Sequence, residues 1–116
     1  MTGENLLILG GGASGLVAAI TAARLGVCVV ICEKNGRVGK KLLLTGNGRC
    51  NLSNSSVSPS AYNRPDFVAS ILEKCGCEDI RAFFLNLGLL TYEDSSGRVY
   101  PRSDTSSSVL DVLRLE

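Results

Sequence analysis

Two short apolar runs lie near the N-terminus, at residues 6–9 and 27–32, and glycines follow the first run directly. Between them, Leu16, Ala19, Ile20 and Ala23 recur at the spacing of one helix face. This pattern predicts a strand at 6–9, a helix at 14–25 that Gly26 ends, and a second strand at 27–32. Because neither run alternates with polar residues, we expect both strands to be parallel and buried on both faces.

The pattern changes after residue 34. Residues 35–60 show no clear period and are rich in Gly, Asn and Ser, which is typical of a long functional loop. Apolar spacing then predicts a helix opened by Pro65, a second helix at 78–87, a hairpin of residues 89–93 and 98–100, and a last helix from Ser106.

The expected fold class is therefore α/β, with a single domain in three parts: a Rossmann-like βαβ unit at 1–34, a loop at 35–60, and helices plus a hairpin at 61–116. Since two parallel strands do not complete a doubly wound sheet, we expect this chain to be the N-terminal portion of a larger fold.

The first strand-to-helix turn reads Gly10-x-Gly12-x-x-Gly15. The first glycine permits a tight turn, the second lets backbone approach a pyrophosphate, and the third lets the helix pack close to the strand. The phosphates would then lie over the helix N-terminus, where free N–H groups and the helix dipole favour anions. Strand, glycines, helix and second strand follow in the order that dinucleotide binding requires. The alternative is that the glycines serve only a tight turn.

Glu33 stands at the end of the second predicted strand, where a carboxylate can accept hydrogen bonds from the ribose hydroxyls of adenosine. The same charge would repel a 2′-phosphate, so NADP is disfavoured. This unit does not distinguish FAD from NAD, because both contain the same ADP half.

Residues 36–54, GRVGKKLLLTGNGRCNLSN, form a second motif. Residues 45–48 can present successive backbone N–H groups in a concave nest, and Lys40, Lys41 and Arg49 add positive charge. These groups suit an anionic, planar, polar cofactor. From composition alone, a solvated glycine-asparagine loop explains the motif equally well.

The 116 residues carry a net charge of +1 and no histidine, so nothing favours a nucleic acid or an anionic membrane as partner. Five cysteines without a secretory signal fit a cytoplasmic protein, and their spacing predicts no metal site. Residues 5–23 are uncharged, as a membrane helix would be, but three consecutive glycines argue against that interpretation.

Three segments, GGGASG (10–15), GKKLLLTGNGRCNLSN (39–54) and GRVYPRSDTSSSVLDVL (97–113), resemble the bacterial NAD(P)/FAD-dependent oxidoreductases that are called aminoacetone oxidase-like or YhiN/BaiN-type flavoproteins. The TGNGRCN core carries this resemblance more specifically than the glycines do. The resemblance implies FAD as cofactor, with its ADP part and flavin bound by Gly10, Gly12, Ala13, Ser14, Gly15, Glu33, Lys34, Lys41, Thr45, Gly48, Arg49, Cys50 and Asn51. Some members reduce carbon–carbon double bonds of oxidised bile-acid intermediates, but others have no assigned substrate, so no substrate is transferred.

The resulting hypothesis is an FAD-dependent oxidoreductase that acts on a small molecule, with NAD(P)H as a candidate electron donor. The alternatives are an NAD-dependent dehydrogenase and a nucleotide-binding fragment that is catalytically incomplete by itself. No catalytic acid or base can be assigned. Tyr92 and Tyr100 are proton donors by residue type, although hairpin tyrosines usually pack. Cys50 could be redox active, but no second cysteine stands at CxxC spacing.

Overall fold

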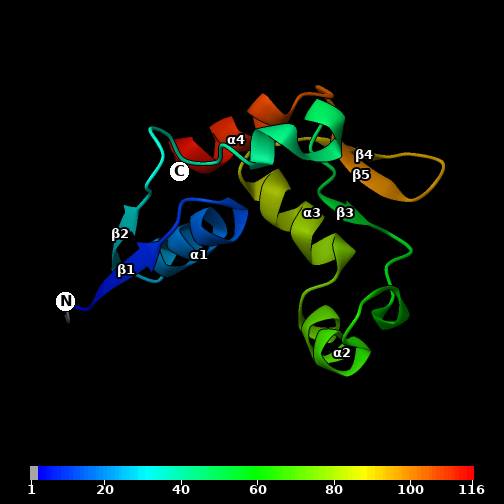
Figure 1. Cartoon of the computed structure of the whole chain (residues 1–116), viewed down its shortest axis with the longest axis horizontal. Helices are drawn as coiled ribbons and strands as arrows, with labels where there is room; N and C mark the ends of the chain where they lie inside the picture. The colour runs from blue at the N-terminus through cyan, green and yellow to red at the C-terminus, as the bar shows by residue number, and fades with distance from the viewer. Residues whose placement is uncertain (1–2) are drawn as a thin grey trace.

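A computed structural model describes residues 3–116. The N-terminal unit is β1 (Asn5–Leu9), α1 (Ala13–Arg24) and β2 (Cys28–Cys32). The two strands are parallel, with Leu7 opposite Val30, and α1 packs against one face of the pair (Figure 1). The predicted strand, helix and strand are therefore confirmed, with each boundary within one residue of its expected position.

The expected burial of these strands is wrong for this chain. Leu9 is 80% exposed and Val30 is 54% exposed, while Ile31 lies toward α1 and is only partly exposed. In the part of the chain that the structure describes, α1 is the main cover of this pair of strands, so side chains that point away from α1 meet solvent. Continuous apolar sequence thus marks a strand that is suited to burial on both faces, although only one face is covered here.

The second half contains α2 (Pro65–Lys74), α3 (Cys77–Asn86), β4 (Thr91–Glu93), β5 (Arg98–Pro101) and α4 (Ser106–Leu115). All five elements were predicted, and β4 and β5 form the expected antiparallel hairpin. The long loop is more ordered than predicted: it contains the 3-10 segment η1 (Leu42–Gly48), the strand β3 (Ser53–Asn54) and the short η2 (Pro59–Ala61). β3 adds to β5 as a third strand, and its polar two-residue sequence gave no periodic signal.

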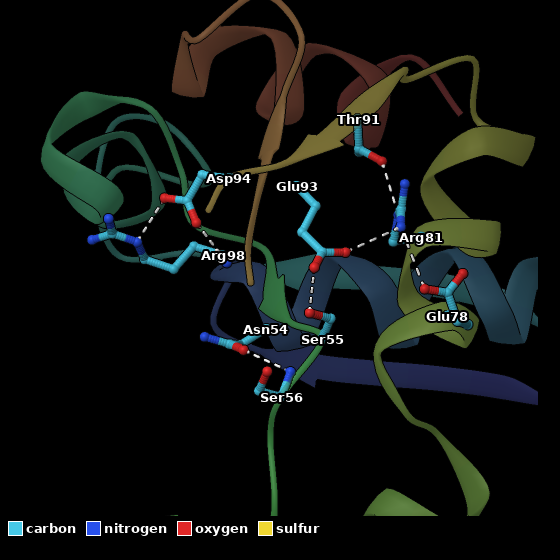
Figure 2. A network of polar contacts seen from close by, with 9 residues as sticks. All are labelled: Asn54, Ser55, Ser56, Glu78, Arg81, Thr91, Glu93, Asp94 and Arg98. Carbon is cyan, nitrogen blue, oxygen red and sulfur yellow. Dashed lines mark hydrogen bonds and ion pairs between the residues drawn. The ribbon is translucent and has the colours of Figure 1, made fainter. Parts of the chain in front are cut away.

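Polar side chains hold α3 against this three-stranded sheet (Figure 2). Arg81 of α3 donates hydrogen bonds to Glu78 and to Thr91 of β4, and it lies 3.9 Å from a carboxylate oxygen of Glu93. Ser55, just after β3, donates to the other carboxylate oxygen of Glu93 at 2.6 Å. The network therefore connects α3, β3 and β4 on one side of the hairpin.

The core forms around α4, which lies between the N-terminal unit and the hairpin (Figure 1). Val109, Leu110 and Leu113 of α4 are almost fully buried together with Leu16 of α1 and Leu42 of η1. At the start of α4, the buried Ser106 hydroxyl donates to the Leu43 carbonyl at 2.8 Å. α4 therefore packs both on α1, the helix that follows the glycine-rich turn, and on the loop that follows β2. In residues 3–116, no helix is both long and apolar enough to cross a membrane.

Replacing Gly39 by alanine should destabilise the fold by about 1–3 kcal/mol. Gly39 has φ of +68°, and an added Cβ would lie 2.2 Å from Leu110 Cδ1 in the core. Leu110 can move only by disturbing α4, because it is 1% exposed. Chemical denaturation would measure the loss, with Gly36→Ala as control, because among the described residues nothing lies within 4 Å of a Cβ at that position. Equal stability of the two variants would contradict the prediction.

Candidate functional site

The glycine-rich turn between β1 and α1 has the geometry that its spacing predicts. Gly10 has φ of +102° and donates to the Cys32 carbonyl at 2.7 Å, which ties the turn to the end of β2. An added Cβ at Gly15 would lie 2.1 Å from the Gly10 carbonyl oxygen, so the close approach of helix and turn requires glycine. At Gly12, no described atom lies within 4 Å of such a Cβ, so the space above the turn is open.

The N-terminus of α1 opens into this space. Gly12 is the N-cap residue, and among the described residues no side chain caps the helix and no acid lies in its first turn. Ala13 and Ser14 are both exposed there. The first amides and the positive end of the helix dipole can therefore bind an anionic group.

Glu33 follows β2 and reaches back to the same turn. Its Oε2 accepts a hydrogen bond from the Gly11 amide at 2.8 Å, and its Oε1 accepts bonds from the Asn35 amide and the Asn35 side chain, both at 2.9 Å. The backbone amides of Asn35 and Gly11 lower the pKa of this carboxyl below its ordinary value, and Lys34 acts in the same direction. The carboxylate is therefore ionised and fixed beside the open space above the turn.

Gly11 is a site residue that the sequence motif did not single out. It is buried, an added Cβ would lie 2.5 Å from Val38 Cγ1, and its carbonyl accepts a hydrogen bond from the Gly39 amide at 2.7 Å. The second of the three consecutive glycines is thus required where residues 38 and 39 cross the turn. The run of three glycines was the only sequence signal for a special role of Gly11. The residue that packs against it, Val38, is distant in sequence, so the contact itself could not be predicted.

The TGNGRCN segment has unusual backbone, as its composition suggested. Gly46, Asn47, Gly48 and Cys50 all have positive φ, and an added Cβ at Gly46 would lie 2.4 Å from the Asn51 nitrogen. Two amides that follow the predicted nest are used internally, because Arg49 donates to the Gly46 carbonyl and Cys50 to the Thr45 carbonyl. The Thr45 hydroxyl also donates internally, to the Leu42 carbonyl at 2.7 Å. The segment, residues 45–51, is therefore a folded knuckle in which the Thr45 hydroxyl and the Arg49 and Cys50 amides are already engaged.

The Cys50 side chain belongs to the core, whereas the sequence left open a redox-active thiol at this position. It is 5% exposed and packs in the cluster that contains Leu42 and Leu110. Burial raises the pKa of its thiol, so the reactive thiolate is disfavoured. Any contact of residue 50 with a ligand would have to come from its backbone.

Arg49 lies against the hairpin, with its guanidinium carbon 4.2 Å from the centre of the buried Tyr100 ring. The neighbouring Tyr92 hydroxyl donates to Asp104 at 2.5 Å, and this bond raises the pKa of Tyr92. Both tyrosines are thus engaged in packing or hydrogen bonding. Among the predicted site residues, Lys34, Lys41, Thr45, Gly48 and Asn51 are exposed.

Arg49→Ala should lower stability by about 1 kcal/mol, because a partly desolvated cation–π contact is lost. Arg49→Lys should recover part of the loss, since the positive charge remains while the planar stacking surface does not. Thermal unfolding would measure both variants, with Arg64→Ala as control on the exposed segment before α2. A stability loss for Arg64→Ala equal to that of Arg49→Ala would refute the role of the ring contact.

The structure thus brings together only part of the predicted site. Gly10, Gly12, Gly15 and Glu33 surround one open turn, with Gly11 and Gly39 as its support. The TGNGRCN knuckle overlaps the second half of η1, which packs on α4, and its Arg49 packs on Tyr100 of β5. An apolar groove of about 540 Å³ lies between α1, β2 and α4, and none of the predicted site residues lines it.

Comparison with known proteins places these features in context. Residues 4–116 match the Rossmann domain of HI0933-like proteins. The chain is 47% identical over 113 residues to a 3-dehydro-bile acid delta(4,6)-reductase of Clostridium scindens, covering 94% of this chain and 27% of that protein. It is 30% identical over 115 residues to a ribosomal RNA dihydrouridine synthase of Haemophilus influenzae, covering 97% of this chain and 28% of that protein. The corresponding Escherichia coli enzyme is 29% identical over 111 residues, covering 94% of this chain and 28% of its own length.

Proposed function

Because the chain belongs to the HI0933-like family and matches its Rossmann domain over residues 4–116, we propose that it is the FAD-binding portion of a flavin-dependent oxidoreductase. The observation that carries this proposal is the open turn, which has an uncapped helix N-terminus on one side and the ionised Glu33 on the other. The chain spans about a quarter of the length of the curated relatives it matches, so the activity proposed is that of the full-length protein.

The residues of the turn fit the ADP half of FAD. The pyrophosphate would lie over Gly12 and the exposed amides of Ala13 and Ser14, where an added Cβ would meet no described atom at Gly12. Gly10 and Gly15 would keep the turn and the N-terminus of α1 close together, and Glu33 would accept a hydrogen bond from the ribose hydroxyl. The helix dipole thus matches the anionic pyrophosphate, and the fixed carboxylate of Glu33 matches the ribose hydroxyl.

The second motif would contribute to the flavin side. We infer that Thr45, Gly48, Arg49 and Asn51 contact that part of the cofactor, with residue 50 contributing backbone only, and that Lys34 and Lys41 add positive charge near the phosphates. The support is their resemblance to a flavoprotein motif, the exposure of all of them except the partly buried Arg49, and the strained backbone of the knuckle.

When bound, the flavin would supply hydride and electron transfer, while this chain binds and orients it. One relative is named as a bile-acid delta(4,6)-reductase and the others as dihydrouridine synthases, and dihydrouridine is uridine with one carbon–carbon double bond reduced. We therefore propose reduction of such a bond as the reaction class, with NAD(P)H as electron donor and the cytoplasm as location.

The visible spectrum of the purified full-length protein tests this proposal. Heat-released cofactor should show flavin absorbance and should co-migrate with FAD in chromatography. Release of NAD without any flavin would favour an NAD-dependent dehydrogenase instead. A colourless protein that shows no thermal shift with either FAD or NAD would reject nucleotide binding altogether.

A further inference from the structure

The hydrogen bonds of Glu33 leave it little capacity for a ligand. A carboxylate has about four acceptor directions, two on each oxygen. Oε1 accepts the backbone amide and the side-chain amide of Asn35, and Oε2 accepts only the Gly11 amide. Both directions of Oε1 are therefore used, whereas one direction of Oε2 remains.

From this we propose that Asn35 is a positioning residue for nucleotide binding: it occupies Oε1 of Glu33 and so directs Oε2 alone toward the 2′-hydroxyl of the adenosine ribose. The inference rests on the proposed FAD site. Asn35 is absent from the glycine motif and from the residues that the family resemblance implicates, and its own side chain is not expected to touch the nucleotide.

The position of Oε2 supports this role. Gly11, whose amide binds Oε2, lies between the first and second glycines of the motif, so this oxygen is held beside the turn over which the pyrophosphate would lie. Asn35 holds the opposite oxygen from the far side of the carboxylate, through two donors that belong to one residue. Without the side-chain donor, the backbone amides of Asn35 and Gly11 still hold the two oxygens, but one acceptor direction of Oε1 becomes free. Oε1 can then compete with Oε2 for the ribose hydroxyl or bind water instead.

The geometry favours an amide over a carboxylate or a methyl group at residue 35. A carboxylate there would present an acceptor to Oε1 and place a second negative charge beside an ionised group. An alanine would leave the backbone donor in place and remove only the side-chain bond. Asn35→Ala is therefore the mild variant and Asn35→Asp the severe one.

The test uses the full-length protein and measures dissociation constants by calorimetry for FAD, ADP and 2′-deoxyADP. In the wild type, loss of the 2′-hydroxyl should weaken ADP binding roughly tenfold, as for a hydrogen bond to a charged group. Asn35→Ala should weaken FAD binding about fivefold and Asn35→Asp more, and in both variants the ratio between 2′-deoxyADP and ADP should fall toward one. Asn63→Ala and Asn63→Asp, on the exposed segment before α2, are matched controls and should behave as wild type.

The outcomes are separable. If the wild type binds neither FAD nor ADP, the proposed function fails and this inference fails with it. If the wild type binds both but the Asn35 variants keep the wild-type ratio, FAD binding stands and the positioning role is refuted. Equal weakening of ADP and 2′-deoxyADP would show that Asn35 acts on stability of the site only, which also refutes it.

Discussion

Gly15→Ala should destabilise the fold by about 3 kcal/mol or more and abolish measurable FAD binding. The added Cβ would lie 2.1 Å from the Gly10 carbonyl oxygen, which is a backbone atom. A flexible side chain could move aside at small cost, but here the N-terminus of α1 must move away from the turn. Such a shift displaces the amides that we propose bind the pyrophosphate.

Gly12→Ala separates the two effects. Gly12 has φ of −80°, and no described atom lies within 4 Å of its added Cβ, so the fold should lose less than about 1 kcal/mol. The methyl group would nevertheless occupy the space proposed for the pyrophosphate, so FAD affinity should fall at least tenfold. Chemical denaturation and calorimetry would measure the two quantities. If Gly12→Ala binds FAD as the wild type does, the pyrophosphate does not lie over this turn.

Glu33→Gln should weaken FAD binding by roughly tenfold or more and remove its acid dependence. A glutamine has one oxygen and one NH2 group, whereas Gly11 and Asn35 present N–H donors to both ends of the group. One donor must therefore lose its acceptor, and the ribose loses an ionised partner. Glu73→Gln, on the exposed surface of α2, removes the same charge as a control.

The acid dependence follows from the lowered pKa of Glu33. The amides of Asn35 and Gly11 stabilise the ionised carboxylate of Glu33 in the folded state. The stabilisation of the folded site by these hydrogen bonds is therefore complete above the ordinary glutamate pKa, about 4.3. It is lost as pH falls from there through the lowered pKa of the folded state. FAD affinity of the wild type should fall in that range, whereas Glu33→Gln should show no such decline. A parallel decline in both proteins would assign the acid sensitivity to another group.

Much of the fold was predictable because its signals are local. The strands, the helices and the hairpin were indicated by apolar spacing, by Gly26 and by the polar turn at 94–97. The family was identifiable from three short segments, and the match of residues 4–116 confirms it. β3 and η1 escaped prediction because a two-residue polar strand and a 3-10 segment with positive φ have no period to detect.

Sequence by itself determined the βαβ unit, the need for glycine at the turn, and an acid at the end of β2, because each depends on residues that are close along the chain. Only the tertiary structure decided that Gly11 supports the crossing at Val38 and Gly39, and that the Cys50 thiol is buried against α4. It also decided that Arg49 stacks on Tyr100. These are contacts between segments far apart in sequence, and composition cannot specify which residues meet when α4 packs across the N-terminal unit.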